Sequence, residues 1–294
     1  MLLRKLLIIS ICCFNAAYGQ LKIESATDFL TDDPSFDEQF MAQKRVLKII
    51  ATPSEKRTLQ EIEPLDKRYF YNFDRRGRMV KKEIVFTNSI EMRDPKNTNY
   101  VYDDMGNLIS EQTQEYNSYF TDYYEYDHLG RVKVKSTYRE IGTTTENGSA
   151  IIEGRELVSK KNYSYQPVSN GVKRHYHNDY GRIYKYDLTT FNEEGLIETT
   201  QTKYIAAKNY AWKKYYYKNR LPYRIEQNEN GTASELLIQY DSQNRLLKQD
   251  VYYGGAHKFT TDYIYNDAGL LTAQIRMDHA SGYMLIYQYE YIYY

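Results

Sequence analysis

Cysteine is nearly absent from this sequence. The 294 residues include two cysteines, Cys12 and Cys13, and both lie in the apolar stretch near the start of the chain. Without that stretch, the chain has no disulfide, no thiol nucleophile and no thiolate ligand for a metal. The remaining sequence must therefore reach a stable fold through packing and hydrogen bonds alone.

Proline is scarce, and neither sign of charge is in excess. There are six prolines, and 39 basic residues balance 39 acidic residues. A nucleic-acid-binding protein needs a basic excess or a basic stripe, so we expect no nucleic-acid partner. Beyond the first 19 residues, no stretch is apolar enough for a membrane-spanning helix. We expect a protein that is not an integral membrane protein.

Residues 1–19 are predicted to be a signal peptide. Arg4 and Lys5 form a short basic start, the run from Leu6 to Phe14 is apolar, and Ala17-Tyr18-Gly19 is a small-x-small cleavage site. We expect a secreted, periplasmic or outer-surface protein whose mature chain begins at Gln20. A lipoprotein signal is the alternative, although a bulky residue precedes each cysteine.

Tyrosine is abundant, at 34 residues, and a tyrosine-containing string recurs along the chain. Tyrosine favours strands, so the composition predicts an all-β protein. The string has an aromatic residue first, then Asp or Asn, and Gly three residues later. Copies begin at residues 73, 102, 126, 177, 191, 240 and 265, and a shortened copy begins at 217. From 191 onward the spacing is about 25 residues, which is typical of repeat architectures.

Each position of the string has a mechanical role in a hairpin turn. In the copy at 126–132, Asp127 opens the turn because its side chain accepts hydrogen bonds from backbone N–H groups ahead of it. Gly130 takes a positive φ, as a three-residue loop with a bulge requires. Gly130→Val is therefore expected to cost far more stability than Gly142→Val. The turn residues predicted at positive φ are Gly77, Gly106, Gly130, Gly181, Gly195, Asn244 and Gly269.

Residues 20–65 stand outside the repeat. Ser35 and Glu38 have the spacing of a capping box, which predicts a short helix over about 35–45, followed by a strand over 46–52. This segment is expected to cover the first open edge of a repeat domain that spans residues 66–294.

The YDxxGR[LV] unit at Tyr126–Val132 resembles the YD repeat of the bacterial RHS family, and the resemblance covers about residues 66–294. It implies hairpins that spiral into a shell around a C-terminal domain. This chain has too few units to close a large shell, and Asp94-Pro95 lacks the Gly of the family's Asp-Pro-x-Gly pair. We therefore expect an all-β antiparallel β-hairpin repeat sheet or partial solenoid, with a short N-terminal helix.

No catalytic, cofactor or metal site is expected, and we interpret the chain as a protein that is not an enzyme. His175 and His177 share a strand face, but His177 occupies the aromatic position of the repeat and is interpreted as a packing residue. Glu193 and Glu194 lie in a repeat turn, where acidic residues form turns. No nucleophile elbow or phosphate-binding loop is present.

The aromatic residues around Trp212 suggest a binding surface. Neighbouring residues of a strand point to opposite faces, so some of these rings are exposed and can stack on a sugar or dock a peptide. The candidate ligand-binding residues are Trp212, Lys213, Lys214, Tyr215 and Tyr216. The predicted function is a structural or ligand-binding repeat protein, with a glycan or another cell-envelope protein as partner.

Two alternatives remain open. One is an outer-membrane β-barrel, although the strand that begins at Leu108 offers no uninterrupted apolar face to lipid. The other is a glycan-active enzyme whose site the sequence does not reveal.

Overall fold

The computed structural model describes residues 34–87, 96–115, 118–144, 150–207 and 210–294. The predicted signal peptide, both cysteines and Asp94-Pro95 lie outside these residues. Within them, 19 strands form a single antiparallel sheet, and there is one helix. The elements are α1 (Glu38–Lys44), β1 (Val46–Lys56), β2 (Ile62–Pro64), β3 (Lys67–Phe73), β4 (Met79–Phe86), β5 (Lys96–Tyr102), β6 (Leu108–Glu115), β7 (Ser118–Tyr126), β8 (Val132–Thr144), β9 (Ala150–Val168), β10 (Gly171–His177), β11 (Ile183–Phe191), β12 (Ile197–Tyr204), β13 (Tyr210–Lys218), β14 (Leu221–Glu229), β15 (Thr232–Tyr240), β16 (Leu246–Tyr253), β17 (Ala256–Tyr265), β18 (Leu271–Asp278) and β19 (Met284–Tyr293).

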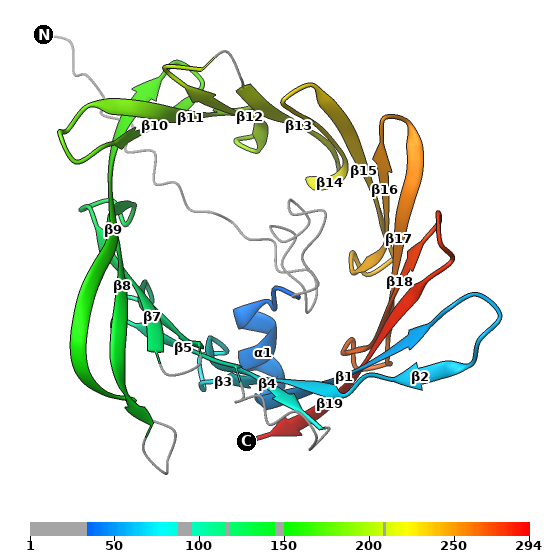
Figure 1. The fold of residues 1–294 in the computed structure, drawn as a ribbon. Helices are drawn as coiled ribbons and strands as arrows, with labels where there is room; N and C mark the ends of the chain where they lie inside the picture. Colours follow the sequence, from blue (N-terminus) through cyan, green and yellow to red (C-terminus); the bar gives the residue numbers. More distant parts are fainter. Residues whose placement is uncertain (1–33, 88–95, 116–117, 145–149, 208–209) are drawn as a thin grey trace, which may run out of the picture.

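The sheet closes on itself. β1 pairs with β19 from Val46↔Tyr293 to Lys56↔Met284, and on its other side it pairs with β3 from Lys48↔Asn72 to Ala51↔Tyr69. From β3 to β19, each strand pairs with the next one in the sequence. The short strand β2 lies beside the end of β1. The other 18 strands make the ring that Figure 1 shows.

The predicted open sheet or partial solenoid is therefore wrong, and so is an RHS-type repeat shell. Residues 46–56 do not cover an open edge, because β1 is itself hydrogen-bonded between the first repeat strand and the last one. Because all strands twist in the same sense and are tilted, a long sheet curves until its first and last strands meet. Closure leaves neither end of the sheet as an unpaired strand edge. The predicted domain boundaries at residues 19 and 65 stay predictions.

The recurring string forms the turns at one end of the hairpins. In the copy at 126–132, the N–H of Gly130 donates to the carbonyl of Asp127 at 3.0 Å. The Oδ1 atom of Asp127 accepts from the N–H groups of Leu129 and Arg131 at 2.9 and 3.0 Å. The register shifts between Glu125 and Tyr126, which marks a bulge. All seven turn positions have positive φ, from 60° at Asn244 to 94° at Gly106.

The aromatic residue of the string holds successive hairpins together. The hydroxyl of Tyr102 donates to the carbonyl of Met79 at 2.9 Å, and that of Tyr126 donates to Leu108 at 2.7 Å. Each acceptor is the last residue of the preceding copy. Two later copies do the same, with Tyr217 bonded to Ile197 and Tyr240 to Pro222. Tyrosines outside the string make similar bonds: Tyr165 to Val132, Tyr291 to Leu271 and, across the closure, Tyr294 to Phe73. Tyrosine hydroxyls therefore tie several hairpins to their neighbours.

The helix α1 lies inside the ring (Figure 1). Its N-cap is Asp37, whose Oδ1 accepts from the N–H of Phe40 at 2.7 Å, whereas the sequence spacing pointed to Ser35. Just before the helix, Phe36 packs edge-on against Tyr71 and Phe73 of β3. This contact identifies the inner face of the sheet. No helix in the described part of the chain is long and apolar enough to cross a membrane.

Candidate functional site

The faces of the wall follow from the register. Direct partners in an antiparallel ladder point to the same face, so the inner face can be followed strand by strand from Tyr71. In one direction it passes through Lys82, Thr98, Thr113, Phe120 and Arg139, and in the other through Ile49 and Tyr291. The two directions meet on β8 and β9, where Lys135 and Lys161 are direct partners on the inner face.

One half of the inner wall is buried and apolar. It comprises β14–β19, β1 and β3, and its side chains form one cluster with Phe36 and Met41. Eleven inner residues of this half are each at most 9% exposed: Ile49, Ala51, Tyr69, Tyr71, Ile225, Leu236, Ile238, Val251, Tyr263, Tyr287 and Tyr289. This half is the hydrophobic core of the protein.

The inner wall of β6–β12 is polar and partly exposed. On β7, Asp122 pairs with the Nζ atom of Lys135 at 2.7 Å and accepts from the hydroxyl of Thr137 at 2.5 Å. Arg139 and Lys161, on the inner faces of β8 and β9, are exposed. These side chains need water or a polar ligand beside them.

A second polar cluster surrounds Asp187 on β11. This carboxylate accepts from Arg174 at 2.7 Å, from the hydroxyl of Thr202 at 2.8 Å, and from the hydroxyl of Tyr176. Burial raises the pKa of Asp187, but hydrogen bonds from Tyr176, Arg174 and Thr202 outweigh it, and that pKa lies below its ordinary value. The side chain of Arg174 is 42% exposed, so this cluster also borders water.

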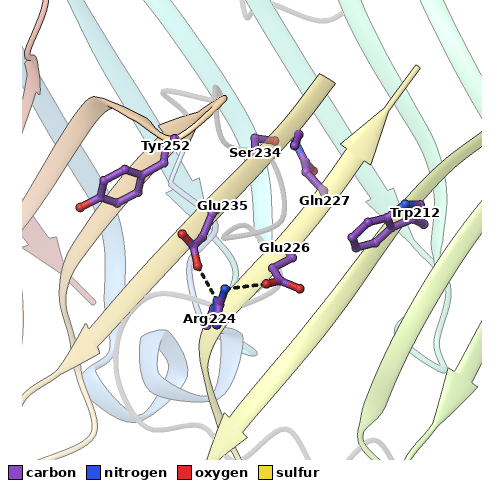
Figure 2. Close-up of a pocket in the computed structure, with 9 residues that line it drawn as sticks. Trp212, Arg224, Glu226, Gln227, Ser234, Glu235 and Tyr252 are labelled. Carbon is purple, nitrogen blue, oxygen red and sulfur yellow. Dashed lines mark hydrogen bonds and ion pairs between the residues drawn. The ribbon is translucent and has the colours of Figure 1, made fainter. Parts of the chain in front are cut away.

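A pocket of about 350 Å³ lies on the outer wall over β13–β16 (Figure 2). Trp212 of β13 and Tyr252 of β16 are at opposite sides of it, and a charged cluster lies between them. Arg224 donates from Nη2 to Oε1 of Glu226 at 2.5 Å, and its Nε pairs with Glu235. The remaining lining residues are Gln227, Ala233, Ser234 and Gly255.

The five residues predicted to bind a ligand are divided between the two faces. Trp212, Lys214 and Tyr216 face outward, and Lys213 and Tyr215 face inward as the partners of Gln227 and Ile225. Trp212 lines the pocket. Ligand binding by these five residues stays a prediction.

The other residues of the pocket were not among the predicted site residues. Arg224 and Glu226 are two positions apart on one strand, and that spacing places them on one face. Glu235 and Tyr252 come from other strands, and only the register brings them to the same surface.

Charged residues occur in the middle of several strands on the outer wall. Glu140 of β8 is 2% exposed and pairs with Arg155 at 3.1 Å. Asp250 of β16 is 8% exposed and pairs with Lys248 at 3.4 Å. Glu140 and Asp250 are covered by neighbouring side chains, but their partners Arg155 and Lys248 are 46% and 34% exposed. A strand that faces lipid needs an apolar outer face, and the outer wall is not apolar at these two charged partners.

No protein-family model matches the chain, and no curated protein matches it in sequence. Among solved structures, it is similar to a porin-like protein from Bacteroides uniformis, with 11% identity and a TM-score of 0.40, over 85% of this chain and 97% of that chain. A porin-like protein from Bacteroides vulgatus has 12% identity and a TM-score of 0.32, over 84% and 98% of the two chains. A LolA-superfamily protein from Nitrosomonas europaea has 9% identity and a TM-score of 0.25, over 86% and 88%.

The predicted identity, function and partners need correction. The membership of an RHS-type repeat family and the function as a glycan- or peptide-binding repeat protein are wrong, because the strands form a closed barrel. The outer-membrane barrel, retained above as an alternative, fits this architecture better. The exclusion of an integral membrane protein is also wrong, since a closed barrel is one of the architectures that can span a bilayer.

Proposed function

We propose that the chain is a non-enzymatic, porin-like barrel of the bacterial cell envelope that admits small polar solutes along the inner wall of β6–β12. The observation that carries the proposal is the asymmetry of the inner wall. Charged and hydroxyl side chains of β6–β12 are partly exposed there, while the opposite half is buried with α1. A barrel of 18 strands is too wide for its own side chains to fill. The helix therefore occupies one side and leaves the polar side for water and solutes.

The predicted signal peptide supports an envelope location, because it directs the chain out of the cytoplasm. The charged outer positions on β8 and β14–β16 fit strands that face water or a neighbouring protein at those points. The proposed solute path runs through the lumen. It therefore requires a polar inner wall, whatever part of the outer wall is in contact with lipid.

Cysteine labelling tests the solute path directly. A chain without residues 1–19 has no cysteine, so single cysteines report alone. Ser159 is the inner-face partner of Thr137, and its neighbour Lys160 is the outer-face partner of Ser136. We expect Ser159→Cys to react readily with a small thiol reagent. Its reaction with a maleimide attached to a 5 kDa polyethylene glycol should be at least about ten times slower, because a polymer of this size does not fit into the lumen of the barrel. Lys160→Cys, the matched control, should react with both.

Two outcomes would contradict the proposal. An inner cysteine that reacts with neither reagent means a closed interior. An inner cysteine that reacts equally with both means a wall that encloses nothing. Vesicles loaded with a small fluorophore add a second readout: dye release that falls after labelling of Ser159→Cys, but not of Lys160→Cys, identifies the lumen as the path.

A further inference from the structure

Strand β9 overlaps only partly with each of its neighbours. β8 pairs with β9 from Ala150 to Asn162, whereas β10 pairs with β9 only from Asn162 to Val168. From Ala150 to Lys161, one edge of β9 is therefore hydrogen-bonded to β8, and no strand in the described part of the chain pairs with the other edge. Closure pairs the two ends of the sheet, but it does not cover a strand that extends past its neighbour. The β8–β9 hairpin is the long one at the left of Figure 1.

The unpaired edge, which is the stretch Ala150–Lys161 of β9, is exposed and partly apolar. At about 3.3 Å per residue it is about 40 Å long. Four large apolar side chains in this stretch are exposed, each by between 39% and 54%: Ile151, Ile152, Leu157 and Val158. A long edge strand with exposed apolar side chains is a template for pairing with another strand.

The charged residues of the unpaired edge are divided into an acidic half and a basic half. The exposed members follow one another in the order Glu153, Glu156, Lys160 and Lys161. Arg155 interrupts the acidic half, but it is already paired with Glu140 at 3.1 Å. Leu157 and Val158 separate the two halves, so the stretch has an apolar centre between opposite charges.

We propose that two copies of this chain associate through the unpaired edge, in an antiparallel arrangement with the two-fold axis near Leu157. In a two-fold dimer, both copies contribute the same surface. The antiparallel direction brings the acidic half of each copy beside the basic half of the other, whereas a parallel direction would place like charges together. Leu157 and Val158 lie between the halves, so they meet their counterparts near the axis and lose their contact with water.

The edge favours a second copy over an unrelated strand. Charges and bulges protect open edges, and β9 has both, since its register with β8 shifts between Thr137 and Tyr138 and between Ile141 and Gly142. A strand with another sequence would leave the charges of β9 unpaired, and that cost makes the pairing selective. Each copy contributes a single strand edge, which is less than a standard protein–protein interface, so we expect a dissociation constant in the micromolar range. The pairing does not depend on the proposed solute path.

Sedimentation equilibrium of the folded chain without residues 1–19 tests the proposal, at concentrations from about 1 to 200 µM that bracket the expected dissociation constant. Two charge-reversal variants give the edge a single sign. Lys160→Glu with Lys161→Glu makes it acidic, and Glu153→Lys with Glu156→Lys makes it basic. We expect the wild-type chain to dimerise and each variant alone to associate at least about tenfold more weakly. An equimolar mixture of the two variants should dimerise again.

Glu193→Lys with Glu194→Lys is the matched control, because it reverses two exposed charges in the turn between β11 and β12. This variant should dimerise as the wild-type chain does, and circular dichroism must show that every variant is folded.

The proposal is overturned if the wild-type chain stays monomeric over this range, which would leave the edge to a strand of another protein. It is also overturned if the edge variants associate as strongly as the wild-type chain, or if the control weakens association as much as they do, because the contact would then lie elsewhere. A mixture of the two edge variants that stays monomeric would show that charge pairing between the copies does not direct the association, and it would overturn the antiparallel arrangement.

Discussion

Glu226 of β14 and Glu235 of β15 are direct cross-strand partners, and Arg224 pairs with both carboxylates. Like charges directly opposite each other on a sheet are destabilising. The guanidinium of Arg224 therefore makes an otherwise unfavourable pair tolerable, and it also forms the centre of the outer pocket (Figure 2).

Arg224→Met should lower the free energy of unfolding by about 1 kcal/mol, since it leaves two facing carboxylates without a counter-ion in a partly exposed site. Adding Glu235→Gln to this variant should recover most of the loss. Urea unfolding in low salt and in 1 M salt provides the measurement, and the loss should shrink in high salt. A loss that the second substitution does not relieve would show that Arg224 acts through packing instead.

Gly130→Val should lower the free energy of unfolding by about 1–3 kcal/mol, because valine is strained at a φ of +72°. The best control is Gly154→Val in β9, where φ is not positive and an added Cβ meets no atom within 4 Å. Gly142, the comparison suggested by the sequence, is unsuitable, because a Cβ there would lie 2.0 Å from the carbonyl oxygen of Ile151. Equal losses at Gly130 and Gly154 in urea melts would contradict the role of the turn.

Asp127→Asn should reduce stability at neutral pH and have little effect in acid. Burial raises the pKa of Asp127, but hydrogen bonds from the side chain and backbone of Arg131 outweigh it, so that pKa is lowered in the folded state. A lowered folded pKa means that the ionised form stabilises the fold above the unfolded pKa, and that this contribution disappears as the pH falls through the folded pKa.

The asparagine variant keeps the turn itself, because Asn192 accepts the corresponding backbone bond at 2.9 Å in another copy. The difference between the urea midpoints of the two proteins, measured from pH 7 down to about pH 2, should therefore begin to shrink only below about pH 4 and should continue to shrink as the pH falls further. A constant difference across this range would mean that the charge of Asp127 does not contribute.

Trp212 is the single tryptophan, so its fluorescence reports on the pocket alone. Because it is partly exposed on the outer wall, its emission should be quenched by iodide in the folded protein, though less than in urea. Trp212→Ala should cost about 1 kcal/mol, well below the 3–5 kcal/mol of a core aromatic residue. Emission shielded from iodide would contradict the outward orientation of this ring.

The local structure was the predictable part of the fold. The Asp-x-x-Gly pattern carries its own hydrogen bonds, so the positions of turns such as Asp127–Gly130 follow from nearest neighbours in the sequence. The helix near residue 40 was also predictable from capping and spacing, with a difference of two residues in its N-cap.

Closure and the faces of the wall were not predictable in the same way. Closure depends on the twist added up over all the strands and on the pairing of β1 with β19, which begins at Val46↔Tyr293. No short sequence pattern predicts either of these. The repeated tyrosine pairs across its own hairpin, as Tyr102 does with Leu108. The bond from its hydroxyl to the preceding hairpin, as from Tyr102 to the carbonyl of Met79, does not follow from the repeat. The unpaired edge of β9 also follows only from the register, because β10 pairs with Asn162–Val168 alone.

The ring is closed by two strands, β1 and β19, that lie far apart in the sequence and are therefore synthesised far apart in time. Among the strands that the structure describes, β1 is synthesised first and its partner β19 last. During synthesis the sheet therefore has open strand edges until β19 has been made, and open edges pair readily with other chains. Closure of the ring depends on β19, so the loss of this one strand would leave both of its neighbours, β1 and β18, as edges that can pair with another chain.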